Sequence, residues 1–198
     1  MKIVIFPGVG SDRVKPSHEY FAGKLRDGLR CDTEIFIWEN GHDHPQTNLP
    51  LKDVRNFVCE VILDFQQVVV HALDMKVPDA DVYIGHSAGS ILALAQDKPS
   101  VIFASPASLV ELIHDNNLEA KKFNDIIRRN KSNVLNIINK YDVISYPLDG
   151  NNIENYEYSG SWCNPLSYFP VTSHIGYWRS DKVIKKIIKT LKDWKVDV

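Results

Sequence analysis

The chain has 198 residues, of which 44% are hydrophobic and 24% charged, so it can bury a sizeable core. Its formal net charge of -2 argues against nucleic acid as the main partner, because phosphate binding needs a concentrated basic surface. No internal repeat and no Pro/Gly/Ser-rich linker divides the sequence, and we expect one domain over residues 1–198.

Apolar runs and amphipathic patterns alternate along the whole chain. In chain order they predict strand 2–6, helix near 17–29, strand 33–38, helix 52–75, strand 81–85, helix 88–96, strand 100–104, helices within 107–129, strand 133–138, a strand near 155–159 and helix 180–194. This alternation predicts an α/β fold in three layers, with a mainly parallel sheet of about six strands and helices on both faces. The lysine-rich stretch 182–195 fits the solvent-exposed face of an amphipathic last helix.

The first predicted strand ends in a glycine-rich turn, Pro-Gly-Val-Gly-Ser at residues 7–11. A turn of this kind after a strand can bind a dinucleotide, but the third glycine position of that motif holds Arg13. No Gly-Lys-Ser/Thr phosphate loop occurs in the sequence. We therefore expect no nucleotide at this turn.

The stretch 85–89, Gly-His-Ser-Ala-Gly, lies between a predicted strand and a predicted helix. Gly-x-Ser-x-Gly in this context is typical of a nucleophile elbow, where a serine sits on a sharp, strained turn and the glycines avoid collisions. Ser87 is therefore the candidate nucleophile.

A serine hydroxyl needs a histidine base and a carboxylate that orients it. After the next strong strand, 133–138, Asp142 is the best-placed acid, with Asp149 as its substitute if the strand boundary is misjudged. Downstream of the elbow only His114 and His174 remain, and His114 precedes the acid inside a helical pattern. The order of the residues thus predicts the triad Ser87, Asp142 and His174.

Acyl transfer also needs backbone N–H donors for the negative oxygen of the tetrahedral intermediate. The residue after the nucleophile, Ala88, supplies one of them, at the start of the elbow helix. We assign the other donor to Val9, in the glycine-rich turn. All these positions follow strands, whose carboxyl ends meet at one edge of a parallel sheet.

The segment 161–170 is unusually aromatic for a loop. We expect Trp162, Tyr168 and Phe169 to contact the substrate, while packing over the sheet edge is the alternative. The roughly thirty residues between the strands 100–104 and 133–138 leave no room for a large cap domain.

No Cys/His cluster has zinc-ligand spacing, and we expect no metal and no cofactor. The three widely spaced cysteines, Cys31, Cys59 and Cys163, fit reduced thiols. The first strand begins within two residues, which leaves no room for a signal-peptide core or a membrane span. We therefore expect a cytoplasmic protein with no integral membrane segment; its oligomeric state is not predicted.

Together these motifs make the chain resemble the α/β-hydrolase superfamily, most closely the small, lid-less bacterial lipases and esterases. The resemblance rests on the turn 7–11, the elbow 85–89, Asp142-Val-Ile with Leu-Asp-Gly at 148–150, and Ser-His-Ile-Gly at 173–176. It implies the triad named above, with Val9 and Ala88 as oxyanion donors.

Residues and resemblance together predict a serine hydrolase that cleaves a small-molecule carboxylic ester through an acyl-enzyme. Three alternatives stay open. They are a thioesterase or amidase with the same triad, a non-catalytic binding protein on the same scaffold, and an interaction scaffold that docks a partner on its aromatic loop.

Overall fold

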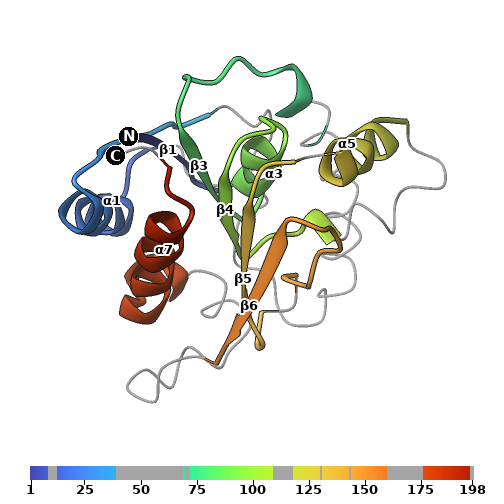
Figure 1. Cartoon of the computed structure of the whole chain (residues 1–198). Helices are drawn as coiled ribbons and strands as arrows, with labels where there is room; N and C mark the ends of the chain where they lie inside the picture. Colours follow the sequence, from blue (N-terminus) through green and yellow to red (C-terminus); the bar gives the residue numbers. More distant parts are fainter. Residues whose placement is uncertain are drawn as a thin grey trace, which may run out of the picture.

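The protein is described by a computed structural model, which covers residues 1–8, 13–38, 69, 72–108, 118–129, 131–142, 144–159 and 176–196. Its centre is a six-stranded sheet with the order β2-β1-β3-β4-β5-β6, in which every neighbouring pair is parallel (Figure 1). The strands are β1 (Lys2–Phe6), β2 (Asp32–Ile35), β3 (Val82–His86), β4 (Ser100–Phe103), β5 (Val134–Asn139) and β6 (Ile153–Tyr158). The parallel α/β architecture predicted from the sequence is confirmed.

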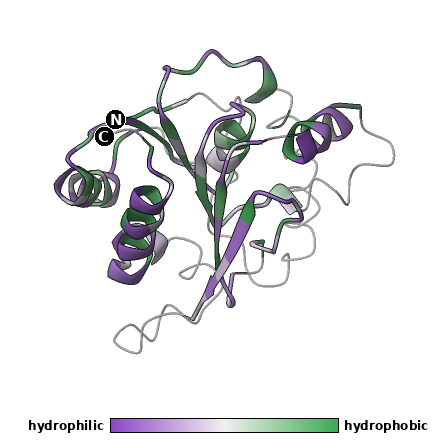
Figure 2. Ribbon diagram, viewed as in Figure 1, coloured by the Kyte–Doolittle hydropathy of each residue, from purple (hydrophilic) through white to green (hydrophobic). Residues whose placement is uncertain are grey.

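The inner strands are apolar runs because both of their faces are covered. Along β1, Ile3 and Ile5 belong to the core on one face of the sheet, and Val4 and Phe6 belong to the core on the other. β6 is the exception. It lies at the edge of the sheet and carries exposed polar residues, which Figure 2 shows as a mostly hydrophilic strand.

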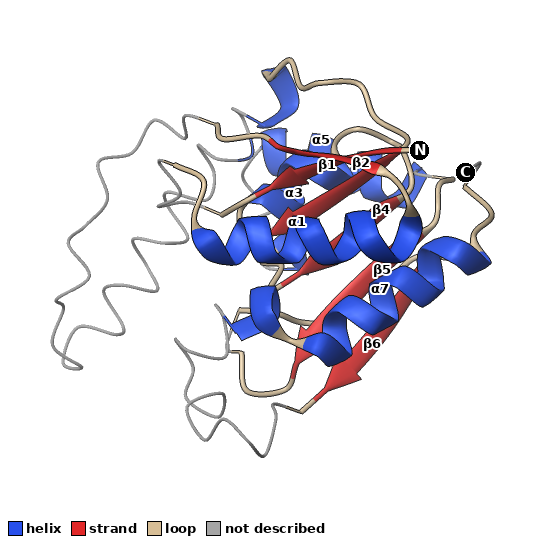
Figure 3. Ribbon diagram, turned by 90° about the vertical axis from the view of Figure 1, so that its left-hand side faces the viewer, coloured by secondary structure: helices blue, strands red, loops and turns tan. Residues whose placement is uncertain are grey.

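Helices cover both faces, as predicted. One face carries α1 (Pro16–Leu29), the 3₁₀ helix η4 (Gly176–Arg179) and α7 (Asp181–Asp193), and Figure 3 shows α1 and α7 lying across the strands. The other face carries α3 (Gly89–Leu94) and α5 (Leu118–Arg129). None of the helices within the described ranges is long and apolar enough to cross a bilayer.

Local sequence explains where α1 and α7 begin and end. Pro16 stands in the first turn of α1, where its missing N–H costs nothing, and Arg30 ends the helix with a left-handed φ of 52°. Ser180 caps α7 by accepting a hydrogen bond from the backbone N–H of Val183 at 3.4 Å.

The predicted elements correspond to the observed ones, with boundaries displaced by a few residues. The strand predicted over 33–38 spans Asp32–Ile35, and the helix predicted over 88–96 spans Gly89–Leu94. Of the helix predicted over 52–75, residues 69 and 72–74 are helical, residue 75 is not, and residues 52–68, 70 and 71 lie outside the described residues.

The strand order creates a crevice at a defined place. The chain goes from β1 outward to β2 and then returns past β1 to β3, so the direction of winding reverses between β1 and β3. In open parallel sheets, ligands bind beyond the carboxyl ends of the strands at such a switch point. Here those ends are followed by the turn that begins at Pro7 and by Ser87.

Candidate active site

Ser87 occupies a strained turn between β3 and α3. Its φ is 52°, a left-handed value that non-glycine residues rarely adopt. The turn is held on both sides. The Ser87 N–H donates to the carbonyl of Phe103 at 3.1 Å, and its carbonyl accepts from the N–H of Ser90 at 2.9 Å and from the Ser90 hydroxyl at 2.6 Å.

The hydroxyl of Ser105 in turn holds that of Ser90 in place. Ser90 Oγ lies 2.7 Å from Ser105 Oγ, which also accepts from the N–H of Ala107 at 3.2 Å. Since Ser90 uses its own proton for the Ser87 carbonyl, Ser105 donates to Ser90. This buried chain of hydroxyl groups offsets the cost of the left-handed backbone at Ser87.

The two motif glycines are required by close packing. A Cβ on Gly85 would collide with Ser90 Cα and would lie 2.5 Å from the Gly89 carbonyl oxygen. A Cβ on Gly89 would collide with the Phe6 carbonyl oxygen and would lie 2.7 Å from that of Pro7. The elbow therefore packs directly on the end of β1, where the glycine-rich turn begins.

Gly8 brings that turn against the nucleophile. A Cβ at Gly8 would lie 2.7 Å from Ser87 Cβ and 3.2 Å from the His86 carbonyl oxygen. Trp38 holds the same turn from the side, because its indole N–H donates to the Pro7 carbonyl at 2.8 Å. Val9, the predicted first oxyanion donor, lies outside the described residues.

Ala88, the predicted second donor, directly precedes α3. Its φ of -57° and ψ of -29° are helical, and its side chain is buried. The backbone N–H of a residue in this position points along the helix axis away from the helix, toward the space beyond the carboxyl end of β3.

Asp142 follows β5 at the same edge of the sheet. It is only 5% exposed, and a turn that starts at Asn139 fixes its backbone, whose N–H donates to the Asn139 carbonyl at 2.8 Å. Oδ1 accepts from the N–H of Ile144 at 3.2 Å, and Oδ2 accepts from the hydroxyl of Tyr177 at 3.3 Å. A buried carboxylate held at both oxygens has the form of an orienting acid.

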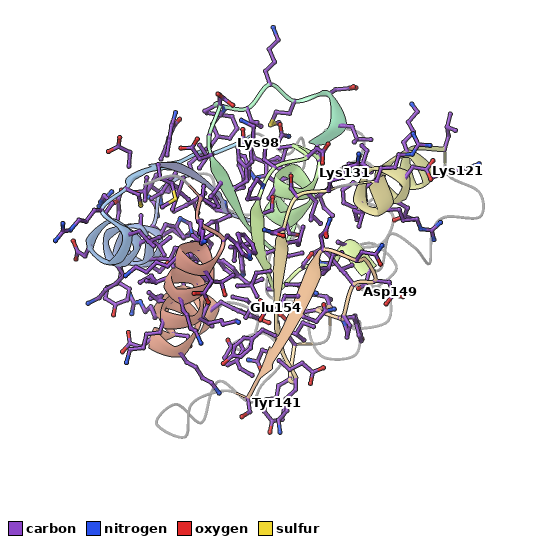
Figure 4. All side chains as sticks on the ribbon, viewed as in Figure 1. Lys98, Lys121, Lys131, Tyr141, Asp149 and Glu154 are labelled. Carbon is purple, nitrogen blue, oxygen red and sulfur yellow. The ribbon has the colours of Figure 1, made fainter. Side chains whose placement is uncertain are left out.

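Asp149, the substitute acid, lies elsewhere. After Asp142 the chain runs back along the sheet, and the N–H of Leu148 donates to Asn155 Oδ1 at 3.0 Å. Asp149 is exposed and precedes the turn that opens β6, toward the amino ends of the strands. In Figure 4 it lies apart from Tyr141, the neighbour of Asp142.

The remaining predicted site residues, His174, Trp162, Tyr168 and Phe169, lie outside the described residues. Among the described residues, no group of three or more His, Cys, Asp or Glu could hold a metal ion. A cavity of about 480 Å³ lies at the opposite edge of the sheet, where Arg128, Lys131 and Asn152 are among its lining residues. It is remote from Ser87 and plays no part in this site.

The sequence did not indicate Trp38, Ser90, Ser105 or Tyr177 as site residues. Serines and aromatic residues inside helices and strands are ordinary core or turn residues, and no local spacing marks them. Only the sheet order brings them to the ends of β1, β3 and β5.

No family model matches the sequence, and no curated protein matches it. Solved structures do match in fold. Alpha/beta hydrolase domain-containing protein 10 from mouse is 12% identical, with a TM-score of 0.53 over 97% of this chain and 88% of that one. The esterase domain of a Rhodothermus marinus protein is 10% identical, with a TM-score of 0.53 over 98% of this chain and 85% of that one.

These similarities and the strand order show that the chain has the α/β-hydrolase fold. At such low identity the likeness extends to the fold alone.

Proposed function

We propose that this protein is a serine hydrolase that cleaves small carboxylic esters. The main support is the backbone conformation and location of Ser87. It is a non-glycine residue with a φ of 52°, and it lies at the switch point of the sheet next to a glycine-rich turn. Such strain is retained at functional sites and costs about 1–3 kcal/mol, which packing elsewhere must offset. A hydroxyl that only filled space would not need this backbone.

Asp142 supports a triad. It follows β5, two strands from β3 in the sheet order, and both of its oxygens accept hydrogen bonds. Because the strands are parallel, the ends of β3 and β5 lie at the same edge as the crevice. The acid and the nucleophile therefore come from separate strands, with β4 between them.

His174 is the proposed base. It stands in the sequence two residues before η4, and Tyr177 of η4 contacts Asp142. Three residues of chain span at most about 10 Å. This short link, together with the order of residues in the sequence, supports His174 as the partner of Asp142.

In the proposed reaction, His174 removes the proton of Ser87 as the serine oxygen attacks the ester carbonyl. The backbone N–H groups of Val9 and Ala88 bind the oxyanion. His174 then donates its proton to the departing alcohol, and water, activated by the same base, releases the acyl group from Ser87. Asp142 orients the imidazole and stabilises its charged form, and no cofactor takes part.

The aromatic residues Trp162, Tyr168 and Phe169 are proposed to line the acyl site, in a single-domain, cytoplasmic enzyme. Alanine at Trp162 or Phe169 would then change the preference for acyl chain length. Unchanged preference with lowered stability would instead assign these side chains to the core.

The test is hydrolysis of p-nitrophenyl acetate, butyrate and octanoate by the wild type and by Ser87→Ala, His174→Ala and Ser132→Ala. Ser132 is a matched control because its hydroxyl donates to the Asp97 carbonyl, far from the crevice. We expect loss of about 10³-fold or more in kcat for the first two variants and none for the third. Equal rates for Ser87→Ala and the wild type would refute the proposal, and faster cleavage of an acyl thioester would redirect it to a thioesterase.

A further inference from the structure

We propose that Tyr177 is a positioning residue that fixes the carboxylate of Asp142 for its partner histidine. The inference rests on the proposed function and deepens it. Tyr177 belongs to η4, 35 residues after Asp142 in the chain, and contacts it through the hydroxyl group.

The direction of this hydrogen bond follows from a count of protons. The backbone N–H of Asn139 donates to the Tyr177 oxygen at 2.7 Å, so one lone pair of that oxygen is used. The single hydroxyl proton is then directed to Asp142 Oδ2, at 3.3 Å. Tyr177 thus joins the last residue of β5 to the carboxylate that follows it.

The phenol ring cannot swing away from this position. Tyr177 is fully buried, with 0% exposure. Its ring stacks on Phe103 with centroids 5.5 Å apart and 24° between planes, and it meets Tyr158 edge to face at 5.4 Å and 77°. Packing on β4 and β6 therefore fixes the position of the hydroxyl oxygen between Asn139 and Asp142.

Tyr177 also remains a donor over the working pH range. Burial raises its pKa, and the nearby negative charge of Asp142 raises it further. Tyr158 is kept protonated in the same way, because burial and Asp142 raise its pKa as well. The described titratable groups near the Tyr177 ring include these two and His86, whose ring centroid lies 6.4 Å away.

The consequence is a carboxylate fixed at both oxygens. Ile144 N–H holds Oδ1 at 3.2 Å, and Tyr177 holds Oδ2. Removal of the tyrosine hydroxyl takes away the hydrogen bond to Oδ2 and weakens the hold on the orientation in which the carboxylate faces the imidazole. The segment that carries the base would thus also carry the group that orients the acid, three residues later.

The first experiment is a double-mutant cycle on kcat with p-nitrophenyl butyrate. We expect Tyr177→Phe to lower kcat about tenfold at unchanged KM. The lost hydrogen bond to the Asp142 carboxylate affects the orientation of the imidazole and not the binding of the substrate. In an Asp142→Ala background the same change has no further effect. Tyr83→Phe, which removes a hydroxyl bonded to the Pro78 carbonyl at 3.0 Å, serves as the matched control and keeps the wild-type kcat.

A merely structural tyrosine would lower kcat by the same factor in both backgrounds, or would leave kcat unchanged, and either result overturns the inference. A second cycle, on Tm, does not depend on activity. Tyr177→Phe should lower Tm by about 3–6 °C in the wild-type background and clearly less in Asp142→Ala, where the hydrogen bond to the carboxylate is already absent. An equal fall in Tm in the two backgrounds overturns the inference. If the wild type does not hydrolyse esters but the fall in Tm still differs between the backgrounds, the proposed function is overturned, while the hydrogen bond between Tyr177 and Asp142 is supported.

Discussion

Gly8→Ala is the substitution that most directly tests how the glycine-rich turn packs on the elbow. The new Cβ would lie 2.7 Å from Ser87 Cβ. Carbon atoms in contact prefer about 3.5–4.0 Å, so the two segments must separate by about 1 Å. Both Cβ atoms are fixed to the backbone, and no side-chain rotation can relieve the collision.

The cost should appear in both stability and rate. Overpacking of this kind costs about 1–3 kcal/mol, which corresponds to a fall in Tm of about 3–10 °C in a chain of this size. A displacement of about 1 Å at the nucleophile should lower kcat/KM about 100-fold. We would measure Tm by thermal unfolding and kcat/KM with p-nitrophenyl butyrate.

Gly23→Ala is the matched control. It lies within α1, where a Cβ would meet, among the described residues, the Arg26 guanidinium alone, at 3.8 Å. Alanine in a helix interior stabilises by about 0.5–1 kcal/mol relative to glycine, so Tm should rise by about 2–3 °C with unchanged kcat/KM. Wild-type kcat/KM in Gly8→Ala would refute the packing of the turn against Ser87.

Two further predictions concern charge. Asp142→Asn should lower kcat by about 10³–10⁴-fold while the exposed Asp149→Asn retains wild-type kcat; the reverse pattern would move the acid to Asp149. Burial, and secondly a nearby lysine, lowers the pKa of His18 from 6.5 to about 4. Because the unfolded chain takes up this proton at higher pH than the folded chain, the free energy of unfolding should fall by roughly 1–3 kcal/mol as the pH drops from 6.5 toward 4. His18→Phe should flatten this decline in Tm measured between pH 7.5 and pH 4.5, and a parallel decline in both proteins would show that other groups cause it.

The elbow shows why part of the site could be predicted from the sequence. The glycines at 85 and 89 are needed for close contacts within a few residues of Ser87 and at the end of β1. The requirement for both glycines is therefore visible in the sequence as a short motif. The left-handed φ at Ser87 confirms the strained turn that this motif predicts. The alternation of strands and helices likewise predicts a parallel sheet without any knowledge of its strand order.

The supporting contacts could not be predicted because they depend on that order. Tyr177 reaches Asp142 only because η4 packs over the ends of β4, β5 and β6, and Trp38 reaches Pro7 only because β2 lies beside β1. Nothing in the local spacing of these aromatic residues distinguishes them from other core residues. Tertiary packing, rather than motif chemistry, selects them.

The most direct test of a serine hydrolase centred on Ser87 is reaction with a fluorophosphonate probe, followed by mass spectrometry of the peptides. We predict one adduct per chain, on Ser87, and no adduct on His174→Ala, in which the serine lacks its base. Ser132→Ala should be labelled like the wild type. No adduct on the folded wild-type protein, or an adduct on another serine, would contradict the assignment of Ser87 as the nucleophile.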